Sequence, residues 1–185
     1  MPKGAPFKCN FKGHKKERKN KSMIVPAILY KEEILKELSD HKYTDDEFYY
    51  SGWIGNDLPE ITLNSDGSNY QFAIVDNGKL IGYFSYYMDW YTSCASRFRL
   101  FSFDRKNPKI GFDVYRELQS LIGEHHIHRL EWRMIGGNPV EKHYDNFCKK
   151  YNGKKFVLTD VIKDKYGKYH NEIIYEIIAG QQLDS

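Results

Sequence analysis

The fold of this chain is decided by residues 97–151, which read RFRLFSFDRKNPKIGFDVYRELQSLIGEHHIHRLEWRMIGGNPVEKHYDNFCKKY. The aromatic and branched residues of 97–104 predict a strand. Apolar residues at helical spacing predict a helix that opens at Gly111, and 129–135 predicts a second strand. A second helix is predicted to begin at Pro139, after two glycines end that strand. The stretch therefore predicts strand, loop, helix, strand and helix in succession.

The loop 105–110 joins the first of these strands to the first helix and carries three cationic side chains. The first amides of a helix have no partner inside the helix, so they bind anions. We expect this junction to hold the pyrophosphate of a nucleotide-like cofactor. An ordinary exposed turn with basic residues remains the alternative.

The rest of the chain predicts strands paired as hairpins on both sides of this stretch. The predicted elements are a strand at 23–30, helices at 31–39 and from Thr44, strands at 71–75 and 80–91 joined by the Asn77-Gly78 turn, and strands at 155–164 and 168–178. This order predicts an α/β fold with a mixed, mostly antiparallel central sheet of about seven strands and helices on both faces.

The composition predicts one domain, residues 23–185, behind a basic tail. Eight lysines and arginines against one glutamate give residues 1–22 a net charge of +7, so the remainder carries −4 of the total of +3. We expect the tail to be disordered, and either a nucleic-acid arm or a solvated extension. Three widely spaced cysteines and the lack of a long apolar run predict a cytoplasmic protein without disulfides or a membrane span.

Residues 23–178 resemble the GNAT superfamily of acetyl-CoA-dependent N-acyltransferases. That family carries Gln/Arg-x-x-Gly-x-Gly/Ala between its fourth strand and third helix. Here the aligned run is 106–111, KNPKIG, in which Gly111 fits, Lys106 replaces the first residue and Lys109 replaces the middle glycine. The run EWRMIGGNPVEKHYD at 131–145 is similar to one in small GNAT proteins of bacteria and their mobile elements.

The resemblance implies an N-acetyltransferase that moves the acetyl group of acetyl-CoA to an amine by direct attack in a ternary complex. Pantetheine would lie where the fourth strand parts from the fifth, and Tyr144 would be the general acid. The other residues that it implies, all cofactor-binding, are Phe101, Ser102, Phe103, Arg105, Lys106, Asn107, Lys109, Ile110, Gly111 and Asn138. Tyr144 also belongs to an apolar helical stripe, and Asn138 equally fits a helix N-cap, so both have a structural interpretation.

Several assignments stay open at this point. Asp89, Glu131 and His143 are candidates for the general base, and none is singled out by its spacing. The acceptor amine could belong to a small molecule, a protein or a charged tRNA, and the oligomeric state is unknown. No metal site is expected, because the histidines of 125–128 have no further ligand at a suitable spacing. The alternative functions are a nucleic-acid-associated protein, or a catalytically inactive one, on the same fold.

Overall fold

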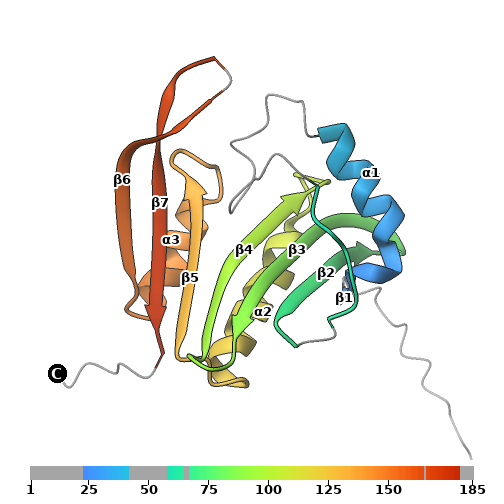
Figure 1. Cartoon of the computed structure of the whole chain (residues 1–185), viewed down its shortest axis with the longest axis horizontal. Coiled ribbons are helices and arrows are strands. Elements are labelled where there is room, and N and C mark those ends of the chain that lie inside the picture. The colour runs from blue at the N-terminus through green and yellow to red at the C-terminus, as the bar shows by residue number, and fades with distance from the viewer. Residues whose placement is uncertain (1–22, 42–57, 65–66, 165, 180–185) are drawn as a thin grey trace, which may run out of the picture.

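The computed structural model describes residues 23–41, 58–64, 67–164 and 166–179. They form a seven-stranded sheet with the order β1-β2-β3-β4-β5-β7-β6 (Figure 1). Its strands are β1 Met23–Pro26, β2 Asn69–Asp76, β3 Lys79–Asp89, β4 Cys94–Ser102, β5 Arg129–Ile135, β6 Lys154–Lys163 and β7 Tyr169–Ile178. The helices are the 3-10 turn η1 Ala27–Tyr30, α1 Lys31–His41, α2 Pro108–Gly123 and α3 Glu141–Lys150.

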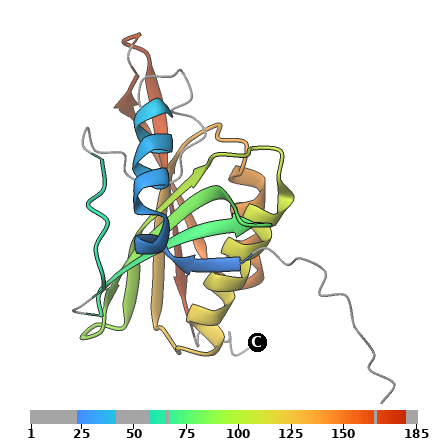
Figure 2. The ribbon, with the colours of Figure 1, turned by 90° about the vertical axis from the view of Figure 1, so that its right-hand side faces the viewer.

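The sheet is mixed but mostly antiparallel. Five of its neighbouring strand pairs run antiparallel, and β4 and β5 run parallel. Helix α1 covers one face of the sheet, and helices α2 and α3 cover the other (Figure 2). We call these the α1 face and the α2–α3 face. The predicted fold class is therefore confirmed.

Apolar side chains of the central strands alternate between two cores. In β3, Phe84 and Met88 pack into the core beneath α2 and α3, whereas Tyr83 packs into the core beneath α1. Ile34 and Leu38 of α1 complete the second core. Since successive side chains of a strand point to opposite faces, a central strand covered on both sides must be apolar on both, as β3 is.

The predicted Asn77-Gly78 hairpin turn is present between β2 and β3. Asn77 and Gly78 have φ angles of 52° and 80°, and Asp76 pairs with Lys79 across the turn. Positive φ at both central residues is what a two-residue turn between twisted strands requires. This turn therefore sets the first pairs, Asp76 with Lys79 and Val75 with Leu80, before a bulge at Ile74 shifts the register along the rest of the strands.

Two predicted element boundaries at the start of the chain and of β4 were wrong. Strand β1 ends at Pro26, and the residues that follow it turn into η1 instead of extending the strand. Proline has no amide hydrogen for a strand ladder, so a strand that reaches it stops readily. Strand β4 begins at Cys94, three residues early, because it already pairs there with Asp89 of β3. The predicted helix from Thr44 lies outside the described residues.

The two helices of the deciding stretch also begin elsewhere than predicted. Helix α2 begins at Pro108, not Gly111, because Asn107 caps it and proline suits its first position. Helix α3 begins at Glu141, not Pro139, because Pro139 and Val140 form a turn before it. Within the described part of the chain, no helix is long and apolar enough to cross a bilayer.

Candidate active site

Strands β4 and β5 meet at one end and then part. They pair only at Cys94 with Arg129 and at Ala95 with Leu130, although β4 runs on to Ser102 and β5 to Ile135. Figure 1 shows the two strands diverging from their common start. We call this divergence the β4–β5 fork. Beyond Ala95 and Leu130, the facing edges of β4 and β5 are not paired with each other, although both strands lie in the middle of the sheet.

Peptide groups of both strands face into the fork. The amide of Phe103 donates to the carbonyl of Ile81 in β3, so the alternation along a strand turns the peptide groups of Leu100 and Ser102 away from β3. On the other side, the amide of Gly136 donates to Asn171 beyond the end of β5. The same alternation therefore turns Glu131, Arg133 and Ile135 toward the fork.

An extended ligand with amide groups can bind these edges as an added strand would. Backbone N–H and C=O groups away from water require partners, and an unpaired strand edge offers them in a row. The alternation places the peptide group of Ser102 toward the fork. Ser102 is the one of the predicted residues 101–103 with this orientation. Phe101 and Phe103 belong to the core beneath α1 or pack against it.

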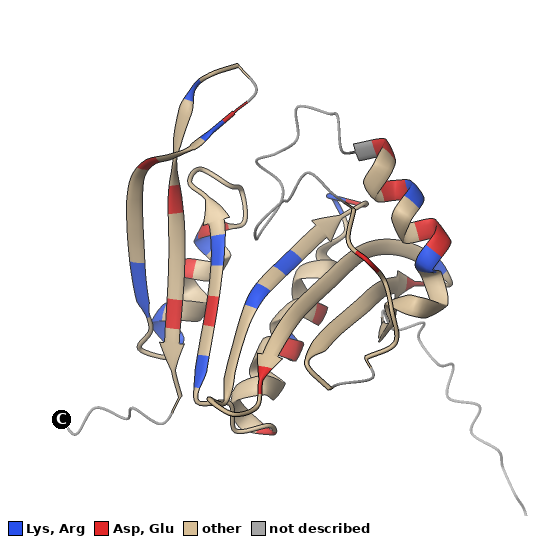
Figure 3. Ribbon diagram, in the orientation of Figure 1, with Lys and Arg blue, Asp and Glu red and all other residues tan. Residues whose placement is uncertain are grey.

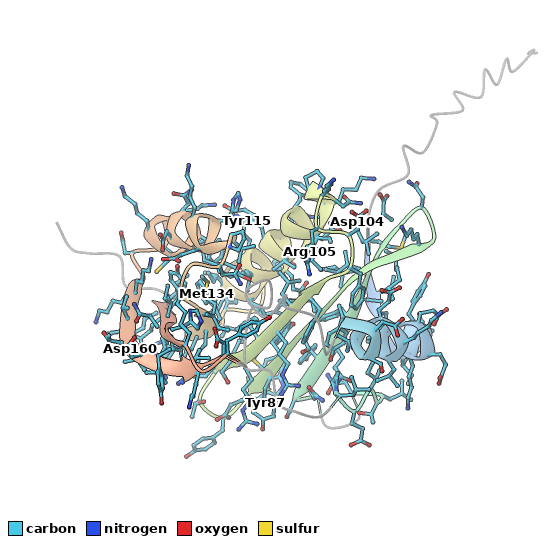
Figure 4. All side chains as sticks on the ribbon, turned by 90° about the horizontal axis from the view of Figure 1, so that it is seen from above. Tyr87, Asp104, Arg105, Tyr115, Met134 and Asp160 are labelled. Atoms are coloured by element: carbon cyan, nitrogen blue, oxygen red, sulfur yellow. The ribbon has the colours of Figure 1, made fainter. Side chains whose placement is uncertain are left out.

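The start of helix α2 follows directly after β4. The side chain of Asn107 accepts a hydrogen bond of 3.1 Å from the amide of Lys109, and Pro108 has no amide hydrogen. Of the first-turn amides that could bind a phosphate, Pro108 therefore provides none, and the amide of Lys109 is already hydrogen-bonded to Asn107. Figure 4 shows Asp104 and Arg105 beside this helix start, on the opposite side of the sheet from Tyr87.

The cations of this loop are not equally available. The ammonium of Lys109 lies 2.5 Å from a carboxylate oxygen of Asp76. The Lys109 hydrogen bond, together with one from Asn107, lowers the pKa of Asp76 despite partial burial. Arg105 and Lys106 are exposed, and Ile110 is buried beneath the helix. The loop thus carries two exposed cations and a third, Lys109, that a carboxylate binds.

Asn138 is structural in this fold. It is 3% exposed, and its side-chain oxygen accepts a hydrogen bond of 3.0 Å from the amide of Val140. Its own amide donates to the carbonyl of Ile135 at the end of β5. Asn138 therefore caps the turn that precedes α3, whereas the N-cap position of α3 is Val140. The sequence predicted that Asn138 would be the N-cap of the helix.

Tyr144 is half-buried on α3, against the α2–α3 face of the sheet. Its ring centroid lies 5.6 Å from that of Trp132 in β5 and 6.0 Å from that of Tyr175 in β7. Trp132 is 2% exposed, and its indole N–H finds no acceptor among the described residues. A buried donor without a partner is costly, so a carbonyl or hydroxyl brought by a ligand could satisfy it.

The α1 face of β5 and β7 carries matched charges. Arg129 binds Glu131 at 2.7 Å and Glu176 at 2.8 Å. Arg133 binds Glu131 at 3.2 Å and Glu172 at 3.5 Å. Glu131, a candidate base, therefore lies on a fork strand but is held by two guanidinium groups.

The other two candidate bases lie away from the fork. Asp89 is at the end of β3, where hydrogen bonds from Thr92 and Tyr91 lower its pKa. His143 is exposed on α3. Water remains able to take the proton in their place.

Sequence reasoning missed Arg97 and Arg99 of β4, the strand on which Figure 3 shows basic bands beside the fork. The contact of Arg97 with the Tyr87 ring and the pairing of Arg99 with Ser85 place both arginines on the α1 face. Their two-residue spacing was a usable signal, because residues two apart in a strand share a face. The pattern was not interpreted because the fork, which gives the two arginines their place, is a property of strand pairing.

Two other clusters do not build a site. The histidines at 125, 126 and 128 are exposed, and among the described residues no three His, Cys, Asp or Glu side chains form a group that could hold a metal. A cavity of about 430 Å³ lies between the turn after β5 and the β6–β7 hairpin. Its charged side chains are already paired, Lys155 with Glu141 and His170 with Asp164.

The sequence matches no protein-family model and no curated protein sequence. Solved structures with the same fold are numerous, and those below are named as acetyltransferases. A protein assigned as an acetyltransferase in Acinetobacter baylyi ADP1 has a TM-score of 0.64 at 13% identity, over 91% of this chain and 97% of that one. The ribosomal-protein-alanine N-acetyltransferase of Brucella melitensis has a TM-score of 0.60 at 14% identity, over 84% and 99%.

A third structure was solved with a ligand. It is a ribosomal L7/L12 alpha-N-protein acetyltransferase in complex with coenzyme A, with a TM-score of 0.50 at 11% identity over 63% of this chain and 66% of that one. At these identities the likeness concerns the fold. The chain therefore has the fold of the GNAT N-acetyltransferases, as the sequence resemblance implied.

Proposed function

We propose that the protein is an acetyl-CoA-dependent N-acetyltransferase. The β4–β5 fork is the observation that carries this proposal, because it leaves peptide groups of two strands free to bind an extended, amide-bearing chain. The fold is that of acetyltransferases, one of which was solved with coenzyme A. Both observations support a ligand with an extended, amide-bearing arm.

The residues present fit the pantetheine arm of acetyl-CoA better than they fit its pyrophosphate. Ser102 and Leu100 on one side, and Glu131 and Arg133 on the other, offer the peptide groups that two amides of pantetheine require. The buried indole N–H of Trp132, which has no acceptor among the described residues, is a further donor. At the phosphate end, by contrast, Asn107 and Pro108 leave fewer free amides than a glycine-rich loop would.

The reaction joins the acceptor nitrogen to the acetyl carbonyl carbon while the carbon–sulfur bond breaks. The amine loses a proton, and the departing thiolate gains one. We propose that Tyr144 supplies that proton, since a phenol of pKa about 10 suits a thiolate as acid. We assign the base to water, because Glu131 is held by two arginines.

Calorimetry with acetyl-CoA tests the proposal directly. We expect saturable one-site binding of acetyl-CoA, followed by release of free thiol when an accepted amine is added. Acetyl-pantetheine, which lacks the nucleotide, should retain a measurable part of the affinity, because the fork is the better-fitted end. Lack of binding by both ligands would remove the proposed function.

The helix start gives one specific reason to keep the inactive alternative. An acyltransferase that lost its cosubstrate would also lose the need for free amides at α2, and Asn107 and Pro108 remove or occupy two of them. The same calorimetry decides between the two functions. Absence of acetyl-CoA binding in a folded protein would favour the inactive alternative, because that alternative has lost its cosubstrate.

A further inference from the structure

Two arginines of β4 lie beside the fork on the α1 face. The guanidinium of Arg97 is exposed and lies 5.1 Å from the ring centroid of Tyr87. Arg99 is half-buried and is paired in register with the buried Ser85 of β3. Neither arginine forms an ion pair or hydrogen bond with another residue in the described part of the chain. A half-buried guanidinium with five unused donors calls for an anionic partner.

The arginines across the fork show what a satisfied pair looks like on the same face. Arg129 and Arg133 of β5 share three carboxylates at 2.7–3.5 Å. Figure 3 shows the basic bands of β4 on one side of the fork and the mixed basic and acidic bands of β5 and β7 on the other. Among the described residues, the β4 side of the fork therefore carries two arginines without a carboxylate partner, whereas the arginines and carboxylates of the β5 side bind one another.

A β-bulge in β4 places the two arginines. The register between β3 and β4 shifts between Ser85 and Tyr87, and Arg97 has a φ of 55°. The bulge allows Ala95 and Phe98 both to pack into the α2–α3 core while Arg97 and Arg99 remain on the other face. A left-handed backbone at a residue with a long side chain is strained, and such bulges re-aim side chains at functional sites.

We propose that the acceptor is a small amine that carries an anionic group, a carboxylate or a phosphate, bound by Arg99 and Arg97. This inference rests on the proposed acetyltransferase function. The planar guanidinium matches the geometry of both anions. The acceptor amine then lies over the fork, between the two charged sides. A polyamine, which has no anion for β4, does not fit this arrangement.

Matched acceptors test the inference on the unmodified protein, with thiol release as the readout. The panel pairs each of the common amino acids with its amide, and phosphoethanolamine with ethanolamine, and adds spermidine. We expect the anionic member of at least one pair to have a kcat/KM about tenfold or more above that of its neutral partner. A preference for amino acids identifies a carboxylate, and a preference for phosphoethanolamine identifies a phosphate. Better turnover of the neutral partners or of spermidine overturns the inference.

Variants of Arg99 show whether its side chain binds the anionic group of the acceptor. Arg99→Gln should lower kcat/KM for the anionic acceptor by about 10- to 100-fold and leave its neutral partner nearly unchanged. Arg99→Lys should restore part of the preference, because it returns the charge without the planar fork. Arg116→Gln on α2, an exposed arginine stacked 5.9 Å from the ring of Phe112, is the matched control.

The affinity for acetyl-CoA separates the two proposals. Arg99→Gln should bind acetyl-CoA as the unmodified protein does, because the arginine lies on the acceptor side. If acetyl-CoA binds and a neutral amine is the better substrate, the enzyme stands and the anion site fails. If acetyl-CoA does not bind and no amine is acetylated, the function fails and the inference falls with it. Equal losses for anionic and neutral acceptors in Arg99→Gln also contradict the inference.

Discussion

Tyr144 is the residue at which packing and catalysis compete. Its ring packs edge-on against Trp132 and Tyr175, so the ring itself stabilises the α2–α3 core. Tyr144→Phe keeps the ring and removes the hydroxyl. If the hydroxyl protonates the departing thiolate, turnover should fall about 100-fold while the Kd for acetyl-CoA stays the same, since loss of an acid acts on the transition state. Steady-state kinetics and calorimetry on the same preparation measure both.

A hydroxyl control is available on the neighbouring helix. Tyr115 of α2 is also half-buried, and its hydroxyl accepts a hydrogen bond of 2.9 Å from Lys150. Tyr115→Phe should therefore change turnover little. Equal rates for Tyr144→Phe and the unmodified protein would remove Tyr144 from the mechanism. Tyr151, whose hydroxyl lies 3.4 Å from the side-chain amide of Gln119, would then be the next residue to test.

Gly111 separates cofactor binding from helix stability. It is exposed in the first turns of α2, and a Cβ added there meets no atom within 4 Å. Gly111→Ala should therefore stabilise the protein by about 0.5–1 kcal/mol, because glycine is a poor helix residue. Gly111→Asp should fold as well, and it should weaken acetyl-CoA binding at least tenfold, about 1.4 kcal/mol, if phosphates lie against this helix start.

The pair of Gly111 variants makes the result interpretable. Chemical denaturation gives the stability of each, and calorimetry gives its affinity for acetyl-CoA. Unchanged affinity in a folded Gly111→Asp protein would move the phosphate site away from α2. It would agree with the few free amides that Asn107 and Pro108 leave there.

At the scale of elements, a charged network fastens α3 to β6 and β7. The hydroxyl of Tyr175 donates to Asp145 at 2.6 Å, and Lys155 binds Asp145 at 2.8 Å and Glu141 at 2.7 Å. Burial alone would raise the pKa of Asp145, but the hydrogen bonds from Lys155 and Tyr175 outweigh it and lower the pKa. The network therefore stabilises the fold while Asp145 is ionised.

Asp145→Asn should lower stability by roughly 1 kcal/mol at pH 7, at the modest end because Asp145 is 43% exposed and solvent screens the pair. The pKa of Asp145 is lower in the folded state than in the unfolded state, where it is about 4. The contribution of Asp145 to stability is therefore complete above the unfolded-state pKa and is lost as the pH falls through the folded-state pKa. The difference between the two proteins should thus be constant from pH 7 to 5 and shrink below pH 4. Urea denaturation at each pH measures it, with the exposed Asp40→Asn on α1 as control. A difference that persists unchanged at pH 3 would contradict this account.

Elements bounded by local signals were predictable from the sequence. Strand β5 lies at Arg129–Ile135 as predicted, because glycines end it, and the β2–β3 turn follows from Asn77-Gly78. The start of α2 was also encoded, in Asn107-Pro108, but these residues were assigned to the loop. In each case the information lies within a few neighbouring residues.

The fork and its charges depend on pairings between distant segments, which local patterns do not contain. Arg129 meets Glu176 because β5 pairs with β7, 47 residues further along the chain. The parting of β4 from β5 was expected from a family resemblance. A role for Arg97 and Arg99 could be proposed only after the structure had placed them beside the fork. The catalytic assignment of Tyr144 rests on the same resemblance and is tested by the variants above.

At the scale of the whole molecule, we expect the fold not to depend on residues 1–22. The buried apolar residues of the described chain begin at Ala27, and β1 enters the sheet with Met23 paired to Val75. A chain that starts at Met23 should therefore keep its melting temperature within a few degrees and its affinity for acetyl-CoA unchanged. Thermal unfolding followed by circular dichroism, and calorimetry, measure the two quantities.

A chain that starts at Lys31 is the matched control, since it also removes β1 and the buried Ala27 and should unfold at a clearly lower temperature. A large loss already at Met23 would mean that the basic residues pack on the domain. The same pair of full and shortened chains tests the nucleic-acid alternative. Eight cations in residues 1–22 would release counterions on binding, so binding to DNA or RNA that falls steeply with salt and disappears with these residues would favour it. We expect acetyl transfer to survive the truncation, because the fork, Tyr144 and Arg99 all lie beyond it.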